Sequence, residues 1–308
     1  MKNRTGLQWL GIIFRGMGMG AADVIPGVSG GTIAFITGIY EELINSLGNI
    51  NLKALIILKK EGFRSFWKHI NGNFFIALFL GIGISVFSLA KLVTFLLATY
   101  PVLLWSFFFG LILASAILIL RTVPKWKINT VFALALGTGI AAFISSLQTT
   151  ADGTAMWYIF MSGAVAICAM ILPGISGAFI LVLLGSYNVI ITGIKDVDIK
   201  IITLFGLGCI VGLLSFSKLL KYLFTHFKPF VLAMLSGFLI GSLVKIWPWK
   251  NKIGEEPIIV HSDGKEDFLM NNVLPHNFEG EAQITGVIVL TIVGLFVVLL
   301  MGRLAPKD

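Results

Sequence analysis

A Pro-Gly-x-Ser-Gly turn occurs twice in this chain, each time inside a long apolar stretch. Residues 21–40 read AADVIPGVSGGTIAFITGIY, and residues 168–187 read CAMILPGISGAFILVLLGSY. In the first copy, the run Ser29-Gly30-Gly31-Thr32 before an apolar helix offers an N-cap hydroxyl, backbone N–H groups and the positive end of a helix dipole. This environment suits an anion, and phosphate especially, because glycines let several N–H donors reach its oxygens. The alternative is a tight turn between closely packed helices.

Two charged residues, Arg15 and Asp23, precede the first turn within the same apolar region. A charge at the centre of a membrane helix costs roughly 2.5–3.5 kcal/mol on insertion scales, so each residue needs a partner or a purpose. The two are eight residues apart, on adjoining parts of one helix surface. Either they pair with each other, or Arg15 grips an anionic head group bidentately while Asp23 positions that group or carries a coupling proton.

Three further charged residues are candidates for an anion path. Glu41 closes the first apolar region, where it either faces loop lysines or has a functional role. Lys91 and Lys218 occupy equivalent positions in the two halves, so they either snorkel to an interface or line the path. The complete set of predicted substrate-binding residues is Arg15, Asp23, Pro26, Gly27, Ser29, Gly30, Gly31, Thr32, Glu41, Lys91, Pro173, Gly174, Ser176, Gly177 and Lys218.

Neither a metal site nor a cofactor site is expected. The two cysteines, Cys168 and Cys209, lie singly in apolar runs, and the four histidines are scattered without ligand spacing. No residue pattern predicts a catalytic nucleophile or base.

The composition predicts a single transmembrane domain covering residues 1–308. Hydrophobic residues make up 57% of the chain, charged residues 12%, and the mean hydropathy is +0.94, all outside the range of soluble domains. The net charge of +8 does not indicate a nucleic-acid partner, because the basic residues fall in short loops between apolar spans. In that position Lys and Arg orient helices in the bilayer.

The two turns belong to an internal repeat. Aligning residues 16–40 with 163–187 gives nine identities in twenty-five positions. Full-length apolar spans are expected near 74–97, 101–120, 129–147, 201–224, 229–247 and 284–303. The two motif regions, 6–47 and 155–194, are too long for one crossing, so each is predicted to fold back on itself. The expected fold is an all-α integral membrane protein with two repeats, about 6–147 and 155–303, each a re-entrant helical hairpin followed by three transmembrane helices.

Loop charges predict the orientation of these segments. Basic residues gather at both termini and in three connecting segments, which are therefore expected in the cytoplasm: 48–72, 121–128 and 218–228. The other connections, 148–154, 195–200 and the acidic loop 248–281, are expected outside. The first motif region then starts and ends inside while the second starts and ends outside, which makes the repeat inverted. Segment 51–70, with apolar and basic residues intermixed, is expected on the inner leaflet.

The motifs carry a resemblance over essentially the whole chain. GMGMGAADVIPGVSGGTIAFITGIYEEL, followed by AMILPGISGAFILVLLGSY, is similar to the polyprenyl-phosphate transporter family. The resemblance implies translocation of undecaprenyl phosphate, the lipid carrier for peptidoglycan, from the outer to the inner leaflet of the bacterial cytoplasmic membrane. A phosphate head needs a polar passage across about 30 Å of hydrocarbon, whereas the polyprenyl tail can stay in lipid.

Two other functions remain open at this point. Membrane undecaprenyl-pyrophosphate phosphatases also combine inverted repeats with a PGxSRSG-like turn, but Gly30 and Gly31 stand here in place of the Arg-Ser of that turn. Hydrolysis also needs an activated nucleophile or base and cations for the developing charge. The third candidate is a transporter for a small ion. Coupling to protons or sodium and assembly as a homodimer are also left open by the sequence.

Overall fold

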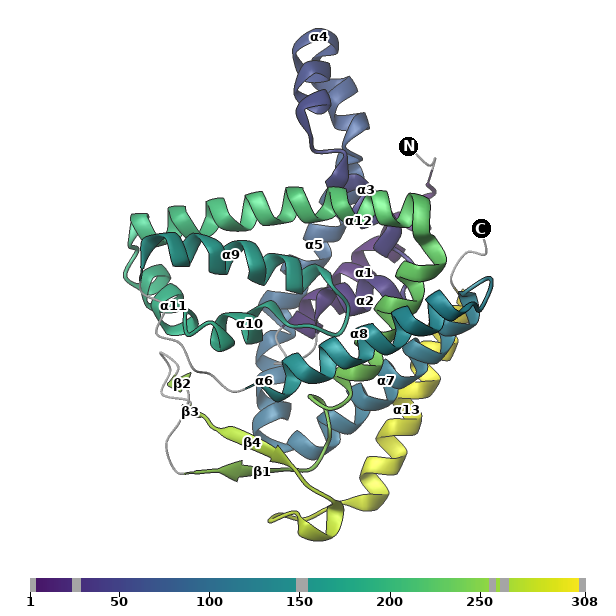
Figure 1. The fold of residues 1–308 in the computed structure, drawn as a ribbon, viewed down its shortest axis with the longest axis vertical. Coiled ribbons are helices and arrows are strands. Elements are labelled where there is room, and N and C mark those ends of the chain that lie inside the picture. The colour runs from purple at the N-terminus through teal and green to yellow at the C-terminus, as the bar shows by residue number, and fades with distance from the viewer. Residues whose placement is uncertain (1–3, 24–28, 148–154, 255–258, 261–265, 305–308) are drawn as a thin grey trace.

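The computed structural model describes residues 4–23, 29–147, 155–254, 259–260 and 266–304. Residues 24–28, which contain the predicted site residues Pro26 and Gly27, lie outside the described residues. The chain is predominantly helical (Figure 1). Its first half contains α1 (Gly6–Asp23), α2 (Gly30–Ile36), α3 (Tyr40–Gly48), α4 (Leu52–His69), α5 (Gly72–Ser88), α6 (Ala90–Thr99), α7 (Pro101–Thr122) and α8 (Ile128–Ser146). Its second half contains α9 (Met156–Ile171), α10 (Gly177–Leu183), α11 (Tyr187–Lys195), α12 (Ile199–Ser242) and α13 (Ile284–Leu304).

Each motif region contains a long helix, then a seven-residue helix and a nine-residue helix. In the first region these helices are α1, α2 and α3, and in the second they are α9, α10 and α11. The seven-residue helices end before glycines at equivalent positions, Gly38 and Gly185, whose φ angles are +75° and +63°. Glycine adopts this left-handed conformation without a Cβ clash, so it stops both helices at the same point. Helices α10 and α11 then meet at an angle of 112°.

The longer helices pack in pairs that correspond between the two halves of the chain. Helix α1 packs mainly against α5, and α9 against the first part of α12, while α7 packs against α13 and α8 against α12. Gly110 of α7 brings its backbone close to the carbonyl of Thr291 in α13, and Gly237 of α12 does the same at the carbonyl of Leu134 in α8. These are paired contacts of the kind that two related halves would make. The inverted orientation of the halves remains a prediction.

Three helices in the described part of the chain are long and apolar enough to cross a membrane, namely α7, α8 and α12, or up to five spans if each of two bent helix pairs is counted as one. One predicted boundary needs correction, because the span expected at 74–97 is divided at Leu89 between α5 and α6. The two spans expected at 201–224 and 229–247 both lie in α12, which consists of two helical parts joined by a kink at Phe227, two residues before Pro229. The kink lies between the two expected spans.

The loop expected at 248–281 contains secondary structure. Strand β1 (Lys250–Ile253) pairs antiparallel with β4 (Leu269–Asn272), and β2 (Ile259–Val260) pairs with β3 (Glu266–Asp267). A short 3-10 helix, η1 (Pro275–Asn277), follows β4. Trp247 and Trp249 donate indole hydrogen bonds to the carbonyls of Val273 and Ala282, so the loop is fastened to the end of α12.

Helix α4 projects from the body of the protein, at the top of Figure 1. It bends back at Gly62, where φ is +82°. The exposed side chains of α4 are partly large and apolar and partly basic, including Leu52, Phe63, Lys59 and Lys60. This mixture fits a membrane surface, and its placement on the inner leaflet remains a prediction.

Candidate functional site

The two Pro-Gly-x-Ser-Gly motifs meet in the interior of the protein. The Ser29 hydroxyl donates to the carbonyls of Met170 and Leu172, at 3.1 and 3.5 Å. In return, the Gly174 N–H donates to the Thr32 hydroxyl at 2.9 Å. Ser29 and Thr32 are 1% and 0% exposed, so these three hydrogen bonds are shielded from water. They join segments more than 140 residues apart in sequence.

The start of α2 is capped differently from our expectation. Ser29 occupies the N-cap position with an extended backbone, but its side chain makes no cap hydrogen bond there. Instead, a carboxylate oxygen of Asp23 accepts the Gly30 N–H at 2.6 Å. The second motif follows the expected pattern, because the Ser176 hydroxyl accepts from the Phe179 N–H at 3.4 Å. The first motif therefore already holds an anionic group, the carboxylate of Asp23, at the position where the sequence predicted a bound anion.

Three motif glycines allow close backbone approach. A Cβ on Gly31 would lie 2.5 Å from the carbonyl oxygen of Ile171, and a Cβ on Gly177 would lie 2.7 Å from that of Ala166. Gly174 has a φ of +85°, and a Cβ there would lie 2.6 Å from the carbonyl oxygen of Phe238. The close packing of small residues that we considered as an alternative is thus present at these three positions.

We expect Gly31→Ala to destabilise the contact between the motifs by about 1–3 kcal/mol, because the added methyl group meets backbone atoms that cannot rotate away. Gly139→Ala in α8 is the matched control, since nothing lies within 4 Å of a Cβ at that position. Thermal unfolding of the two purified variants in one detergent tests this. The midpoint should fall for Gly31→Ala and stay unchanged or rise for Gly139→Ala. Equal midpoints would show that the first motif tolerates a side chain there.

Arg15 and Asp23 lie in different environments. Asp23 binds Gly30 at the end of α1, whereas Arg15 is half-buried about 12 Å back along the helix, given a rise of 1.5 Å per residue. Arg15 interacts electrostatically with Arg4 and Glu42. The guanidinium of Arg4 donates two hydrogen bonds to the Glu42 carboxylate. This pairing balances the charge of Glu42 and leaves the cluster of Arg4, Arg15 and Glu42 with a net charge of +1.

The other predicted charged residues lie at the surface. Glu41 forms an ion pair with Lys228 at 2.7 Å, and both side chains are about half exposed. The sequence analysis gave two explanations for Glu41, and this ion pair agrees with the first of them, a contact with a loop lysine. Lys91 on α6 and Lys218 on α12 are both exposed. Their snorkelling and their lining of an anion path both remain predictions.

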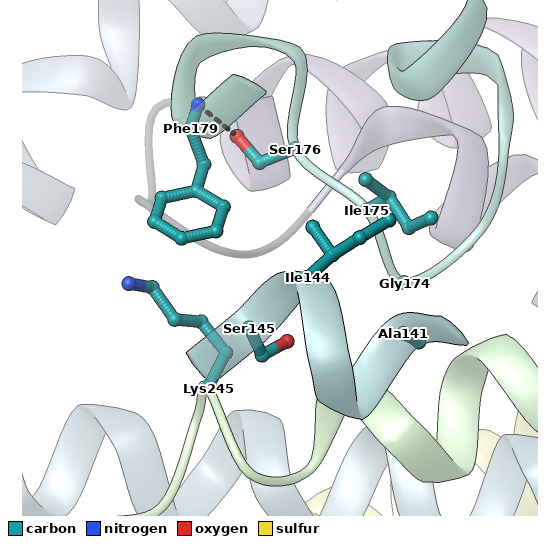
Figure 2. Close-up of a pocket in the computed structure, with 8 residues that line it drawn as sticks. All are labelled: Ala141, Ile144, Ser145, Gly174, Ile175, Ser176, Phe179 and Lys245. Atoms are coloured by element: carbon teal, nitrogen blue, oxygen red, sulfur yellow. Dashed lines mark hydrogen bonds between the residues drawn. The ribbon is translucent and has the colours of Figure 1, made fainter. Parts of the chain in front are cut away.

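A small cavity lies beside the second motif (Figure 2). Its volume is about 10 Å³, roughly the room that one water molecule needs. The lining residues come from α8, from the second motif and from the turn after α12: Ala141, Ile144, Ser145, Gly174, Ile175, Ser176, Phe179 and Lys245. The Lys245 ammonium lies 3.8 Å from the centre of the Phe179 ring. The sequence analysis missed Lys245, which lies at the edge of a predicted span, where lysines commonly snorkel.

A second lysine, Lys250 at the start of β1, contacts the backbone of Lys245. The Lys250 ammonium donates to the Lys245 carbonyl at 2.6 Å and lies 4.0 Å from the centre of the Trp105 ring. Burial, with a smaller contribution from Lys245, lowers the pKa of Lys250 to about 7. The β1–β4 hairpin that begins at Lys250 should therefore respond to pH.

We expect the β1–β4 hairpin to become more stable as pH rises from about 7 to about 10. In this window an unfolded Lys250, with its ordinary pKa of 10.5, binds a proton that the folded residue has released, so higher pH favours the folded state. Hydrogen exchange of residues 250–253 and 269–272, corrected for the intrinsic pH dependence, measures this. Lys250→Gln should remove the pH response. A wild-type protection that does not change with pH would contradict the expectation.

Comparison with known proteins assigns the chain to a family. Residues 19–261 match the family described as undecaprenyl phosphate translocase-like. A polyprenyl-phosphate transporter of Vibrio cholerae is 44% identical over 274 residues, which cover 89% of this chain and 88% of the relative. The chain belongs to the polyprenyl-phosphate transporter family. A second member, the polyprenyl-phosphate transporter of Staphylococcus aureus, is 31% identical over 78% of this chain and 87% of its own.

Membership of the polyprenyl-phosphate transporter family confirms the resemblance seen in the motifs. Both relatives are named as transporters, which agrees with the prediction of a membrane transporter rather than an enzyme. No solved structure matches the chain. Among the described residues, no group of three or more His, Cys, Asp or Glu side chains is arranged to hold a metal ion.

Proposed function

We propose that this protein moves undecaprenyl phosphate from the outer to the inner leaflet of the bacterial cytoplasmic membrane and so returns the carrier lipid for cell-wall synthesis. The single observation that carries this proposal is the direct contact between the two motifs through Ser29, Thr32 and Gly174. It gathers hydroxyl and backbone N–H groups from both repeats at one buried place. A phosphate head crossing hydrocarbon needs such groups to replace its water.

The phosphate head binds between the motifs after their mutual hydrogen bonds open. In the structure these groups bind each other, and the adjoining cavity holds no more than about one water molecule. This arrangement fits a closed state without substrate. The hydroxyls of Ser29 and Thr32 then exchange their protein partners for phosphate oxygens, which form stronger, charge-assisted hydrogen bonds. Among the described site residues, Pro173 and the motif glycines let the backbone approach the head closely.

Asp23 controls access to the first motif. Its carboxylate competes with phosphate for the Gly30 N–H. Protonation of Asp23 weakens this competing bond, so binding of phosphate at the motif is linked to uptake of a proton. This linkage favours a proton over sodium as the coupling ion.

The inverted repeat provides alternating access. With both termini in the cytoplasm and the loop 248–281 outside, the two re-entrant hairpins enter the membrane from opposite faces. The cluster of Arg15 then lies on the cytoplasmic side of the motifs, and Lys245 lies on the outer side. Rocking of one hairpin against the other exposes the head first to one leaflet and then to the other, while the tail stays in lipid.

Leaflet-resolved transport in proteoliposomes tests the proposal. Labelled undecaprenyl phosphate is placed in the outer leaflet, and its loss from that leaflet is followed with and without an imposed pH difference and with and without sodium. We expect protein-dependent transport that responds to the pH difference. Protein-free liposomes and labelled undecaprenol, which lacks the phosphate, are the controls. Transport of undecaprenol at the same rate, or none of the phosphate lipid, would contradict the proposal. Release of phosphate from the diphosphate lipid would indicate a phosphatase instead.

A further inference from the structure

We propose that α4 is an arm that docks on the membrane surface and binds the anionic head groups of phospholipids there. The arm, residues 52–69, consists of two short helical parts that meet at Gly62. It projects from the body of the protein at the top of Figure 1, and Ala54 is its only buried residue. The inference goes beyond the proposed function and does not depend on which lipid the protein moves.

The arm exposes large apolar side chains. Leu52 is 77% exposed and Phe63 is 64% exposed. Leu55, Ile56 and Leu58 are also exposed, at 53%, 52% and 37%. If the arm stood in water, all five side chains would stay hydrated, which is unfavourable. The arm therefore needs an apolar surface to cover it.

The same arm is strongly basic. It carries five basic residues and one acidic residue, Glu61, which together give a net charge of +4. All five basic side chains are exposed, and none of them forms an ion pair with another residue in the described part of the chain. They are Lys53, Lys59, Lys60, Arg64 and Lys68. Charges of this kind are costly inside hydrocarbon, so the arm cannot lie in the interior of the bilayer.

The membrane surface satisfies both requirements at once. Apolar side chains enter the boundary of the acyl chains, while Lys and Arg extend along their stems to the head groups. Aromatic rings favour the same depth, and the Phe63 ring lies 5.5 Å from the Trp67 ring and 6.2 Å from the Phe66 ring, centre to centre. A surface of lipid phosphates complements the charge of the arm, so an anionic membrane binds it more tightly than a zwitterionic one.

The base of the arm is joined to the first motif region. The Asn49 side chain donates to the carbonyl of His69, the last residue of α4, at 3.0 Å. The Asn71 side chain, two residues further on, donates to the Glu42 carboxylate at 2.9 Å and to the Ser46 hydroxyl at 3.2 Å. Glu42 and Ser46 belong to α3. Docking of the arm therefore also positions α3 relative to the lipid surface.

A fluorophore at the bend of the arm tests the proposal. Bimane is attached to Phe63→Cys in the full chain, with Cys168→Ser and Cys209→Ser so that only this position is labelled. The protein is placed in nanodiscs of phosphatidylcholine, with or without phosphatidylglycerol. We expect the emission to shift to shorter wavelength when phosphatidylglycerol is present, because the bend enters a less polar environment. High salt should reduce the shift, since it screens exposed charges.

Two charge variants of the labelled protein separate attraction by the arm from a general effect of charge. The test variant loses three basic residues around the bend: Lys59→Gln, Lys60→Gln and Arg64→Gln. The matched control loses three exposed basic residues at the end of α7 and just before α8: Arg121→Gln, Lys125→Gln and Lys127→Gln. The test variant should lose the shift caused by phosphatidylglycerol, and the control should keep it.

Equal emission in the two kinds of nanodisc would overturn the proposal. Emission typical of water in both would indicate that the arm stands free of the membrane, where a protein partner would have to cover its apolar side chains. A shift that the test variant keeps would overturn the binding of head groups by the basic residues. The thermal unfolding midpoint of each protein identifies any that does not fold, and bimane on Ile56→Cys gives the reading if Phe63→Cys does not fold.

Discussion

Replacing Ser29 with alanine is expected to lower transport of undecaprenyl phosphate by at least about tenfold, toward the rate of protein-free liposomes. The buried Ser29 hydroxyl donates to the carbonyls of Met170 and Leu172 at the end of α9. Its removal leaves these carbonyls without that donor. In the proposed mechanism it also removes one hydroxyl that binds the phosphate.

Ser236→Ala is the control for Ser29→Ala. Ser236 is also buried, at 0% exposure, but its hydroxyl donates to the Leu232 carbonyl within its own helix, α12. This variant makes the same chemical change without touching either motif, so its transport should stay near that of the wild type. Leaflet-resolved transport and a thermal unfolding midpoint are measured on both variants. A folded Ser29→Ala protein that transports at the wild-type rate would remove Ser29 from the mechanism.

The meeting of the two motifs could be predicted from the sequence, because two re-entrant breaks that enter the membrane from opposite faces meet near its middle. The direction of the hydrogen bonds that the two motif serines make could not be predicted. A serine hydroxyl can accept from its own helix or donate to a neighbouring one, and tertiary contacts decide between the two. The Ser176 hydroxyl caps its own helix, α10. The Ser29 hydroxyl instead donates to a carbonyl near the end of α9, and the Asp23 carboxylate caps α2.

Two other features could not be predicted from sequence patterns, for different reasons. The break at Leu89 between α5 and α6 has no proline, and hydropathy averaged over a span does not detect where a helix bends. Lys245 follows the apolar stretch of α12, where a lysine is usually read as an interfacial anchor. Only the packing of α8 and the second motif against that turn shows that its ammonium reaches the Phe179 ring.

Replacing Arg15 with alanine is expected to reduce transport to the background rate. Arg4 already balances the charge of Glu42 through two hydrogen bonds, and Asn71 donates a third. Arg15 therefore provides the net positive charge of its cluster. Arg15 lies about 12 Å along α1 from Asp23, and in the proposed mechanism it binds the head group on the cytoplasmic side of the motifs.

Arg15→Lys separates charge from geometry in this step. An ammonium keeps the positive charge but cannot hold two phosphate oxygens as a guanidinium does, so we expect transport between that of the wild type and that of Arg15→Ala. Arg121→Ala is the control, since Arg121 is an exposed arginine at the end of α7. It should transport normally, and leaflet-resolved transport compares all four proteins. Transport by Arg15→Ala at the wild-type rate would mean that the phosphate crosses without this cation. The path of the head group would then not pass the cluster of Arg4, Arg15 and Glu42.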